Sequence, residues 1–356
     1  MKKYMFYIDS MQMGGAQRVM NNLMDYFLAR DIEIVLLNDV GPSDMEPEYK
    51  INSNIKRIFL NSPVGNIVVK NISRILDLRR IIKNEKPDLV LSFLGPPNIR
   101  MLLSTLGLNV KKFVSVRNDP YKEYGYGLKA FFSRCVFLLA DGCIFQTEDA
   151  QNYFFKSTRK ASVTILNPVN EKFYNCNWKQ GGKDIVLIGR LQEQKNPLLA
   201  LDAFLMIADR YPDYNMVFYG DEELAFEIDN KAKKAGLSDR VKIAGKTQCV
   251  EAVLEHAALY VLSSNYEGMP NALMEAMTVG VPVISTDCPC GGPRMLIRKV
   301  EQGILIPCGD VNSLAEAMTK ILSDKKLQIE MSVHERKRSF EFHPSKVFRQ
   351  WEDYLK

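Results

Sequence analysis

Two carboxylates, Glu267 and Glu275, stand eight positions apart on either side of a predicted turn. Gly268 and Pro270 lie between them, where an apolar strand pattern gives way to a helical one. Pro270 suits a first helical turn because its missing N–H costs no hydrogen bond there. The backbone N–H groups that follow form a potential anion site. This layout fits a ligand with hydroxyl groups at both ends and phosphate between them, as in a nucleotide-sugar.

Two cations, Arg190 and Lys195, stand five positions apart in a second loop, which follows the predicted strand 184–188. Arginine offers phosphate oxygens a planar fork of donors, and lysine offers them a mobile point charge. The alternative is a pair of ordinary surface cations. Their place directly after a buried strand favours a phosphate-binding role, because ligands of doubly wound sheets bind at that end of the strands.

The elements that must position these residues follow a repeated strand–helix pattern. Strand 3–8, a turn at Gly14-Gly15, helix 16–29 and strand 32–37 form a first β-α-β unit. Further strands are predicted at 88–93, 112–117, 142–146, 162–166, 184–188, 215–219, 241–243, 259–263, 282–285 and 303–306. Further helices are predicted at 67–83, 98–106, 125–139, 148–155, 197–211, 222–235, 249–257, 312–323 and 326–355. This alternation predicts parallel sheets.

Because the pattern restarts after a polar segment at 175–183, we expect two doubly wound α/β domains, 1–170 and 171–335. A C-terminal helix at 336–356 is expected to pack back on the first domain. If the two domains face each other, the loops that follow their strands line one cleft. These loops are marked by Gly14, Leu94, Arg117, Arg190, Gly220, Gly245 and Glu267.

Composition narrows the class of protein. The 356 residues include no apolar run of about 20, so no transmembrane helix is expected. Seven scattered cysteines, an odd number, favour reduced thiols in a cytoplasmic protein. Residues 1–170 hold 23 Lys and Arg against 16 Asp and Glu. That excess favours an anionic partner, either a membrane surface or a phosphorylated acceptor, although solvated lysines without a partner are the alternative.

The predicted helices 67–83 and 125–139 carry much of this positive charge. Phe131 and Phe132 stand beside Lys129 and Arg134 in the second helix. Aromatic and basic side chains together are typical of helices that lie on a membrane surface. The alternative is that the aromatic rings face the protein core.

Taken together, these motifs resemble those of glycosyltransferase family 4, which are retaining enzymes of the GT-B fold with two Rossmann-like domains. The resemblance rests on Glu267-x7-Glu275, on Gly189-Arg190-Leu191 with Lys195, and on Gly14-Gly15-Ala16. Asn167-Pro168-Val169 and Cys288-Pro289-Cys290-Gly291-Gly292-Pro293 resemble the members that build bacterial surface polysaccharides, such as capsule or lipopolysaccharide.

The resemblance implies roles for individual residues. Arg190 and Lys195 would bind the donor diphosphate and stabilise it as leaving group. Glu275 would hold the ribose hydroxyls, and Glu267 the hydroxyls of the donor sugar near the reacting carbon. Further substrate contacts would come from Gly14, Gly15, Gly220, Gly245, Lys246, Thr247, Met269, Pro270, Asn271, Ala272 and Leu273. Asp221 replaces a glycine usual after Gly220, so the base pocket is expected to differ there.

One departure concerns the N-terminal domain. Many family members have a histidine after the strand that ends here at Arg117-Asn118, but all three histidines of this chain lie in its second half. We expect Arg117 or Asn118 to contact the donor sugar or the acceptor. A purely structural Asn-Asp-Pro turn is the alternative.

The sequence therefore predicts a retaining glycosyltransferase. It would move a sugar from a nucleotide-sugar, with UDP as the family's commonest carrier, to a polyprenyl-diphosphate-linked saccharide on the inner leaflet of the plasma membrane. No cofactor or metal is expected, since no Asp-x-Asp occurs, and no nucleic-acid partner is expected. A nucleotide-sugar 2-epimerase of the same fold and a non-catalytic binding subunit remain alternatives. An oxidoreductase is disfavoured because Gly-x-Gly-x-x-Gly is absent.

Overall fold

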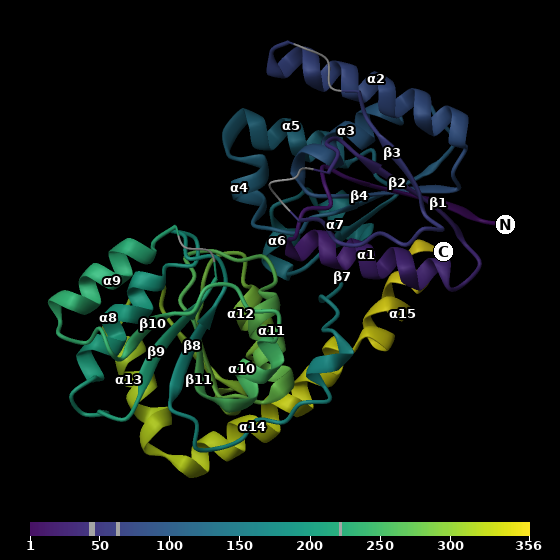
Figure 1. Cartoon of the computed structure of the whole chain (residues 1–356). Coiled ribbons are helices and arrows are strands. Elements are labelled where there is room, and N and C mark those ends of the chain that lie inside the picture. Colours follow the sequence, from purple (N-terminus) through teal and green to yellow (C-terminus); the bar gives the residue numbers. More distant parts are fainter. Residues whose placement is uncertain (43–46, 62–64, 221–222) are drawn as a thin grey trace. The chain divides into compact units, whose positions relative to one another are not determined.

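The computed structural model describes residues 1–42, 47–61, 65–220 and 223–356 (Figure 1). The chain divides into two compact units. The first comprises Met1–Leu166 together with Phe348–Lys356, and the second comprises Asn167–Val347. Each unit is a parallel sheet covered by helices, which confirms the predicted α/β class. No helix among the described residues is both long enough and apolar enough to cross a bilayer.

The first unit holds a seven-stranded parallel sheet in the order β3-β2-β1-β4-β5-β6-β7. Its central strands are buried on both faces, which explains their continuous apolar sequences. The strands are β1 (Lys3–Ile8), β2 (Glu33–Asn38), β3 (Lys56–Phe59), β4 (Leu89–Phe93), β5 (Lys111–Ser115), β6 (Gly142–Phe145) and β7 (Ser162–Thr164). The helices are α1 (Gly15–Leu28), α2 (Ile67–Glu85), α3 (Gly95–Ser104), α4 (Pro120–Tyr124), α5 (Gly127–Phe137), α6 (Glu148–Asn152) and α7 (Lys156–Lys160).

The second unit holds a six-stranded parallel sheet in the order β10-β9-β8-β11-β12-β13. The strands are β8 (Asp184–Ile188), β9 (Asn215–Tyr219), β10 (Val241–Ile243), β11 (Ala257–Leu262), β12 (Val283–Thr286) and β13 (Ile304–Ile306). The helices are α8 (Pro197–Ile207), α9 (Ala225–Lys234), α10 (Val250–His256), α11 (Asn271–Val279), α12 (Gly292–Leu296), α13 (Val311–Ser323), α14 (Lys325–Ser339) and α15 (Pro344–Leu355). Both strand orders reverse beside the first strand of the unit, so each sheet has the switch point at which doubly wound folds bind ligands.

The structure corrects several predicted elements. The continuous helix predicted at 326–355 is wrong. A 3-10 turn at Phe340–Phe342 separates α14 from α15, and Pro344 starts the second helix because its fixed backbone angle suits a first turn. The edge strand β3 and the short helices α4, α7 and α12 were not predicted. The helix predicted from residue 222 begins at Ala225, and Asp221 and Glu222 lie outside the described residues.

The end of the chain packs against the first sheet. The ring of Trp351 stacks on Phe93 with centroids 5.7 Å apart, and Trp351 is fully buried. Tyr354 donates a hydrogen bond of 2.6 Å from its hydroxyl to the carbonyl oxygen of Ala161, next to β7. These contacts make the last turns of α15 part of the first unit.

Candidate functional site

An ion pair joins the loops after β8 and β11 at the carboxyl edge of the second sheet. The Lys195 Nζ atom lies 2.5 Å from Glu267 Oε1, and the Ser264 hydroxyl donates to the same oxygen at 2.7 Å. Both charged side chains are largely buried, with 17% and 8% of their side-chain surface exposed. Lys195 and Glu267, predicted as parts of two separate motifs, therefore meet in one network.

Hydrogen bonds between the same two loops hold this pair in place. The Ser263 hydroxyl donates to the carbonyl oxygens of Lys195 and Asn196, at 2.9 and 2.8 Å. Asn196, which caps α8, has the left-handed conformation and donates from Nδ2 to Asn265 Oδ1 at 3.1 Å. In return, the backbone N–H of Asn265 donates to the Gln194 carbonyl at 2.8 Å. The position of Lys195 is thus set by backbone contacts on both sides of it.

Helix α11 begins directly after this pair. The sequence predicted Pro270 inside the first turn, but it is the residue before the helix, and Asn271 is the first helical residue. The first intrahelical bond runs from the Met274 N–H to the Pro270 carbonyl at 3.2 Å, so the N–H groups of Asn271, Ala272 and Leu273 precede it. Asn167 Nδ2 donates to Asn271 Oδ1 at 2.7 Å, which ties the Asn-Pro-Val motif to the start of α11.

Glu275 lies in α11 and is 5% exposed. Its charge and that of Glu267 both act on the fully buried hydroxyl of Tyr260 in β11. Burial chiefly, and then these two carboxylates, raise the pKa of Tyr260 well above its usual value. The two glutamates of the motif are therefore both close enough to one buried tyrosine to act on it electrostatically.

The glycine-rich segment 288–293 packs against the turn between the glutamates. A Cβ atom on Gly292 would lie 1.8 Å from the carbonyl oxygen of Gly268, a distance that no side chain tolerates. Gly292 thereby allows the 267–270 turn to sit directly on the start of α12. This contact explains why a glycine is needed at that point of the motif.

Two further strand ends of this unit, those of β9 and β10, meet β8 at the same edge. A Cβ atom on Gly220, after β9, would lie 1.8 Å from the Gly189 carbonyl, after β8. The Gly220 N–H donates to the Gly245 carbonyl, after β10, at 3.0 Å. Arg190 and Lys246, next to these glycines, are exposed, and Thr247 is half-buried. The predicted phosphate and base contacts of this unit thus belong to adjacent loops.

The predicted residues of the first unit lie at the carboxyl edge of its own sheet. Gly14 precedes α1 as its N-cap, and Gly15 is the first residue of that helix. Arg117 follows β5, is buried, and stacks its guanidinium 4.9 Å from the centre of the Phe93 ring. Burial lowers the pKa of Arg117 to about 9, against the opposing effect of the Glu123 carboxyl. Asn118 beside it is half-buried.

Sequence reasoning missed two carboxyl groups at this edge, those of Asp9 and Glu123. Asp9 directly follows β1, which is a signal that could have identified it. Burial raises the pKa of Asp9, and burial raises that of Glu123 to about 8. Glu123 lies in the unpredicted helix α4, and nothing in its local sequence marks it.

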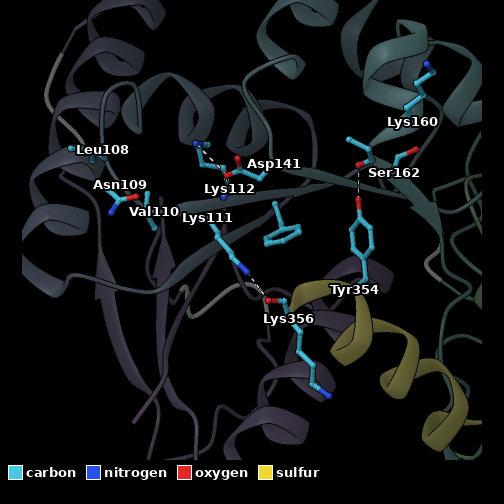
Figure 2. A pocket seen from close by; sticks show the side chains of 12 residues that line it. Leu108, Asn109, Val110, Lys111, Lys112, Asp141, Lys160, Ser162, Tyr354 and Lys356 are labelled. Carbon is cyan, nitrogen blue, oxygen red and sulfur yellow. Dashed lines mark hydrogen bonds and ion pairs between the residues drawn. The ribbon is translucent and has the colours of Figure 1, made fainter.

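A cavity of about 480 Å³ opens at the other edge of the first sheet (Figure 2). Lys111 and Ser162, at the amino ends of β5 and β7, line it together with Tyr354 and Lys356 from the end of the chain. Lys111 Nζ donates to the Lys356 backbone oxygen at 2.6 Å. None of the predicted site residues lines this cavity, because they follow the carboxyl ends of the strands.

The described residues contain no group of three or more His, Cys, Asp or Glu side chains arranged to hold a metal ion. All seven cysteines are free thiols. Positive charge at the carboxyl edge of the second unit includes Lys195, Arg190, Lys246 and the first N–H groups of α11.

Comparison with known families decides the identity. The model of glycosyl transferases group 1 matches residues 169–338, and that of Glycosyltransferase Family 4 matches residues 13–173. The chain belongs to glycosyltransferase family 4. Its two units are therefore the two halves of a GT-B enzyme, and the loops described above are those of a sugar transferase.

Relatives of known activity match this family 4 enzyme over nearly its whole length. A Campylobacter jejuni α-1,4-N-acetyl-D-galactosaminyltransferase, named for an undecaprenol-diphosphate-linked substrate, is 25% identical over 99% of this chain and 97% of its own. An Escherichia coli UDP-Gal:α-D-GlcNAc-diphosphoundecaprenol α-1,3-galactosyltransferase is 26% identical over 89% of this chain and 87% of its own.

Solved structures agree on the fold. A glycosyltransferase from Rickettsia africae superposes with a TM-score of 0.79 at 15% identity, over 100% of this chain and 99% of its own. The Anabaena protein HepE, solved in complex with UDP, gives 0.81 at 14% identity, with the same coverage of both chains. At such low identity these likenesses establish the GT-B fold and no more.

Proposed function

We propose that this enzyme transfers a sugar, with retention, from a UDP-sugar to a polyprenyl-diphosphate-linked saccharide during the synthesis of a bacterial surface polysaccharide. The names of the Campylobacter and Escherichia relatives support this acceptor class, and the second also supports UDP as carrier. The observation that carries the proposal is the buried Lys195–Glu267 pair beside the start of α11.

The leaving group needs the most help in this reaction. As the bond between the sugar carbon and the diphosphate breaks, negative charge grows on the diphosphate oxygen. Lys195 carries three donors, so it can keep its bond to Glu267 and donate to a diphosphate oxygen at the same time. Arg190 is exposed in the same loop and offers a second, planar set of donors. The N–H groups of Asn271, Ala272 and Leu273 add the positive end of α11.

The remaining contacts with the nucleotide-sugar would come from loops at the carboxyl edges of the two sheets. Glu267 would accept hydrogen bonds from hydroxyls of the donor sugar, and Glu275 from the ribose. Gly245, Lys246 and Thr247 would line the base, and Gly14 and Gly15 would approach phosphate or sugar. Retention follows if the acceptor oxygen attacks the face that the diphosphate leaves. The acceptor hydroxyl then passes its proton to the departing diphosphate oxygen, so no separate pair of acid and base is required.

We also propose peripheral attachment to the inner leaflet, in the cytoplasm. Phe131 and Phe132 in α5 are 59% and 53% exposed, which excludes the alternative that both rings face the core. Lys129 is exposed beside them. In α2, Ile67, Val68, Ile72 and Leu76 are also more than half exposed. Exposed apolar side chains among cations suit an anionic bilayer surface.

Turnover with defined substrates tests the reaction. The purified protein is incubated with a panel of UDP-sugars, with and without a polyprenyl-diphosphate-linked saccharide, and in the presence of a chelator because we propose that no metal is needed. Release of UDP that depends on the lipid-linked acceptor supports the proposal. Isomerisation of the sugar without acceptor would instead support the epimerase, and binding without turnover a binding subunit.

A further inference from the structure

The loops that follow β4 and β5 interlock at Glu123. The backbone N–H of Gly95, the first residue of α3, donates a hydrogen bond to the Glu123 carboxyl group. A Cβ atom on Gly95 would lie 3.2 Å from Glu123 Cβ, so a larger residue there would push the helices apart. Asn98, one turn into α3, donates from Nδ2 to the Tyr124 hydroxyl at 3.1 Å. Helices α3 and α4 are thus packed against each other beside this carboxyl.

The chain reaches this contact through a strained residue. Leu94 has φ 74° and ψ 159°, a region that residues other than glycine rarely occupy. Its N–H donates to the Ser115 carbonyl at 3.3 Å, and Asn98 Nδ2 donates to the same oxygen at 2.9 Å. Strain of this kind persists only where the surrounding contacts enforce it, and it is most common at functional sites.

Burial, reinforced by two neighbouring carboxylates, favours the protonated form of the Glu123 carboxyl. Burial raises its pKa to about 8 and outweighs the hydrogen bond from Gly95, which lowers it. The carboxylates of Asp119 and Asp9 raise it further, and the Arg117 guanidinium lowers it. These groups come from the loop before α4, from the end of β1 and from the end of β5. At neutral pH the group is therefore a carboxylic acid with one O–H donor.

One oxygen of this carboxyl group has unused hydrogen-bonding capacity. Glu123 Oε2 is buried, and among the described residues it makes no hydrogen bond. A buried polar atom without a partner destabilises the fold, so it requires an explanation. The residue as a whole is half-buried rather than fully enclosed.

We propose that Glu123 contacts the acceptor saccharide and donates a hydrogen bond to one of its hydroxyl oxygens. The neighbouring carboxylates of Asp9 and Asp119 would repel a phosphate group, so the ligand at this point is the uncharged sugar rather than the diphosphate of the acceptor. Arg117, held over Phe93, acts on the acid electrostatically from the loop after β5. This inference rests on the proposed function.

The test is the pH dependence of KM for the lipid-linked acceptor. If only the acid binds, KM for the wild-type enzyme rises about fourfold between pH 7 and pH 8.5, as expected for one ionisation near pH 8. Glu123→Gln retains an N–H donor and cannot ionise, so its KM should change by less than about twofold in that range. Glu123→Ala should raise KM for the acceptor at every pH, and KM for the UDP-sugar should stay unchanged in both variants.

Stability measurements separate a contact with substrate from a structural role. The folded state holds the Glu123 proton up to about pH 8, whereas the unfolded chain releases it near pH 4.5. The free energy of unfolding of the wild type should therefore fall as pH rises between these values, and Glu123→Gln should remove that loss. Glu123→Gln could remove this pH-dependent loss of stability and still show the same dependence of acceptor KM on pH as the wild type. In that case Glu123 is structural and the proposal is wrong. Absence of any wild-type turnover would instead refute the proposed function.

Discussion

The two sheets end in loops that each place an acid near a cation, but the surroundings of the two acids differ. In the second unit Glu267 accepts from both Lys195 and Ser264, and the loops around it bond to each other through backbone groups. In the first unit the Glu123 carboxyl lies among other acids, and its Oε2 makes no hydrogen bond among the described residues. We infer that the donor edge is organised before the ligand binds, whereas the acceptor edge is completed by its ligand.

The largest effect that tests this comparison is expected from Lys195→Ala. Leaving-group charge appears only in the transition state, so kcat should fall about 100- to 1,000-fold while KM for the UDP-sugar changes much less. Steady-state kinetics measure both constants. Lys183→Ala, a surface lysine of the same unit, is the matched control. A change in KM alone would show that Lys195 binds the ground state and does not stabilise the leaving group.

Removal of Lys195 also leaves Glu267 buried without its main partner, which lowers stability. Thermal unfolding of the variant shows whether the loss of kcat belongs to a folded enzyme. Glu267→Gln keeps the side-chain volume and relieves the unpaired charge, so combining it with Lys195→Ala should restore stability without restoring kcat.

The next test concerns the carboxylate assigned to the nucleotide. Glu275→Ala should weaken the binding of UDP about 10- to 100-fold, because hydrogen bonds to a charged group are worth about 1.5–3 kcal/mol. Isothermal titration calorimetry with UDP measures this directly. Glu316→Gln, an exposed acid on α13, should leave the affinity unchanged. Unaltered UDP affinity in Glu275→Ala would refute the ribose assignment.

Gly292→Ala tests whether the donor edge must be organised in advance. The new Cβ atom would lie 1.8 Å from the Gly268 carbonyl, so the 267–270 turn must move. We expect a loss of stability of about 1–3 kcal/mol in urea unfolding, together with weaker UDP binding. Gly41→Ala, where a Cβ atom makes only ordinary contacts, is the control. Full UDP affinity in Gly292→Ala would mean that the turn tolerates displacement.

The smallest effect on the chemistry is expected from Phe131→Glu with Phe132→Glu. These changes should lower recovery with anionic liposomes about tenfold or more, since each buried ring contributes roughly 1.5–3 kcal/mol. Transfer to a short, water-soluble acceptor should remain unchanged. Phe226→Glu, which alters a 73% exposed ring of the second unit, is the control. Equal recovery of the wild type with neutral liposomes, or with none, would contradict the membrane proposal.

Most of the fold could be predicted because its strands are short apolar runs between turns. Strands 3–8, 184–188 and 215–219 were predicted with the bounds that the structure gives. Strand β3 was missed because its four residues, K-R-I-F, include two cations and lie at the sheet edge, where no apolar run is required. The break before Pro344 was missed because the helical pattern continues on both sides of it.

The candidate site could be predicted only where its signals are local. The glutamates of the 267–275 motif and the cations of the 189–195 loop are adjacent to recognisable turns, so their types and spacing identified them. Their meeting could not be predicted, because Lys195 and Glu267 are 72 positions apart and only the sheet brings them together. Glu123 had no local signal, since its properties depend on burial and on Gly95 and Asp9 from other loops, as well as on the nearby Arg117.

The anomeric configuration of the product tests the central claim most directly. A UDP-α-sugar and the lipid-linked acceptor are converted by the wild-type enzyme, and the new linkage is assigned from its proton NMR coupling. Attack on the face that the diphosphate leaves predicts an α linkage. A β linkage would contradict the account, because it requires attack from the opposite face and a base that the Lys195–Glu267 edge does not supply.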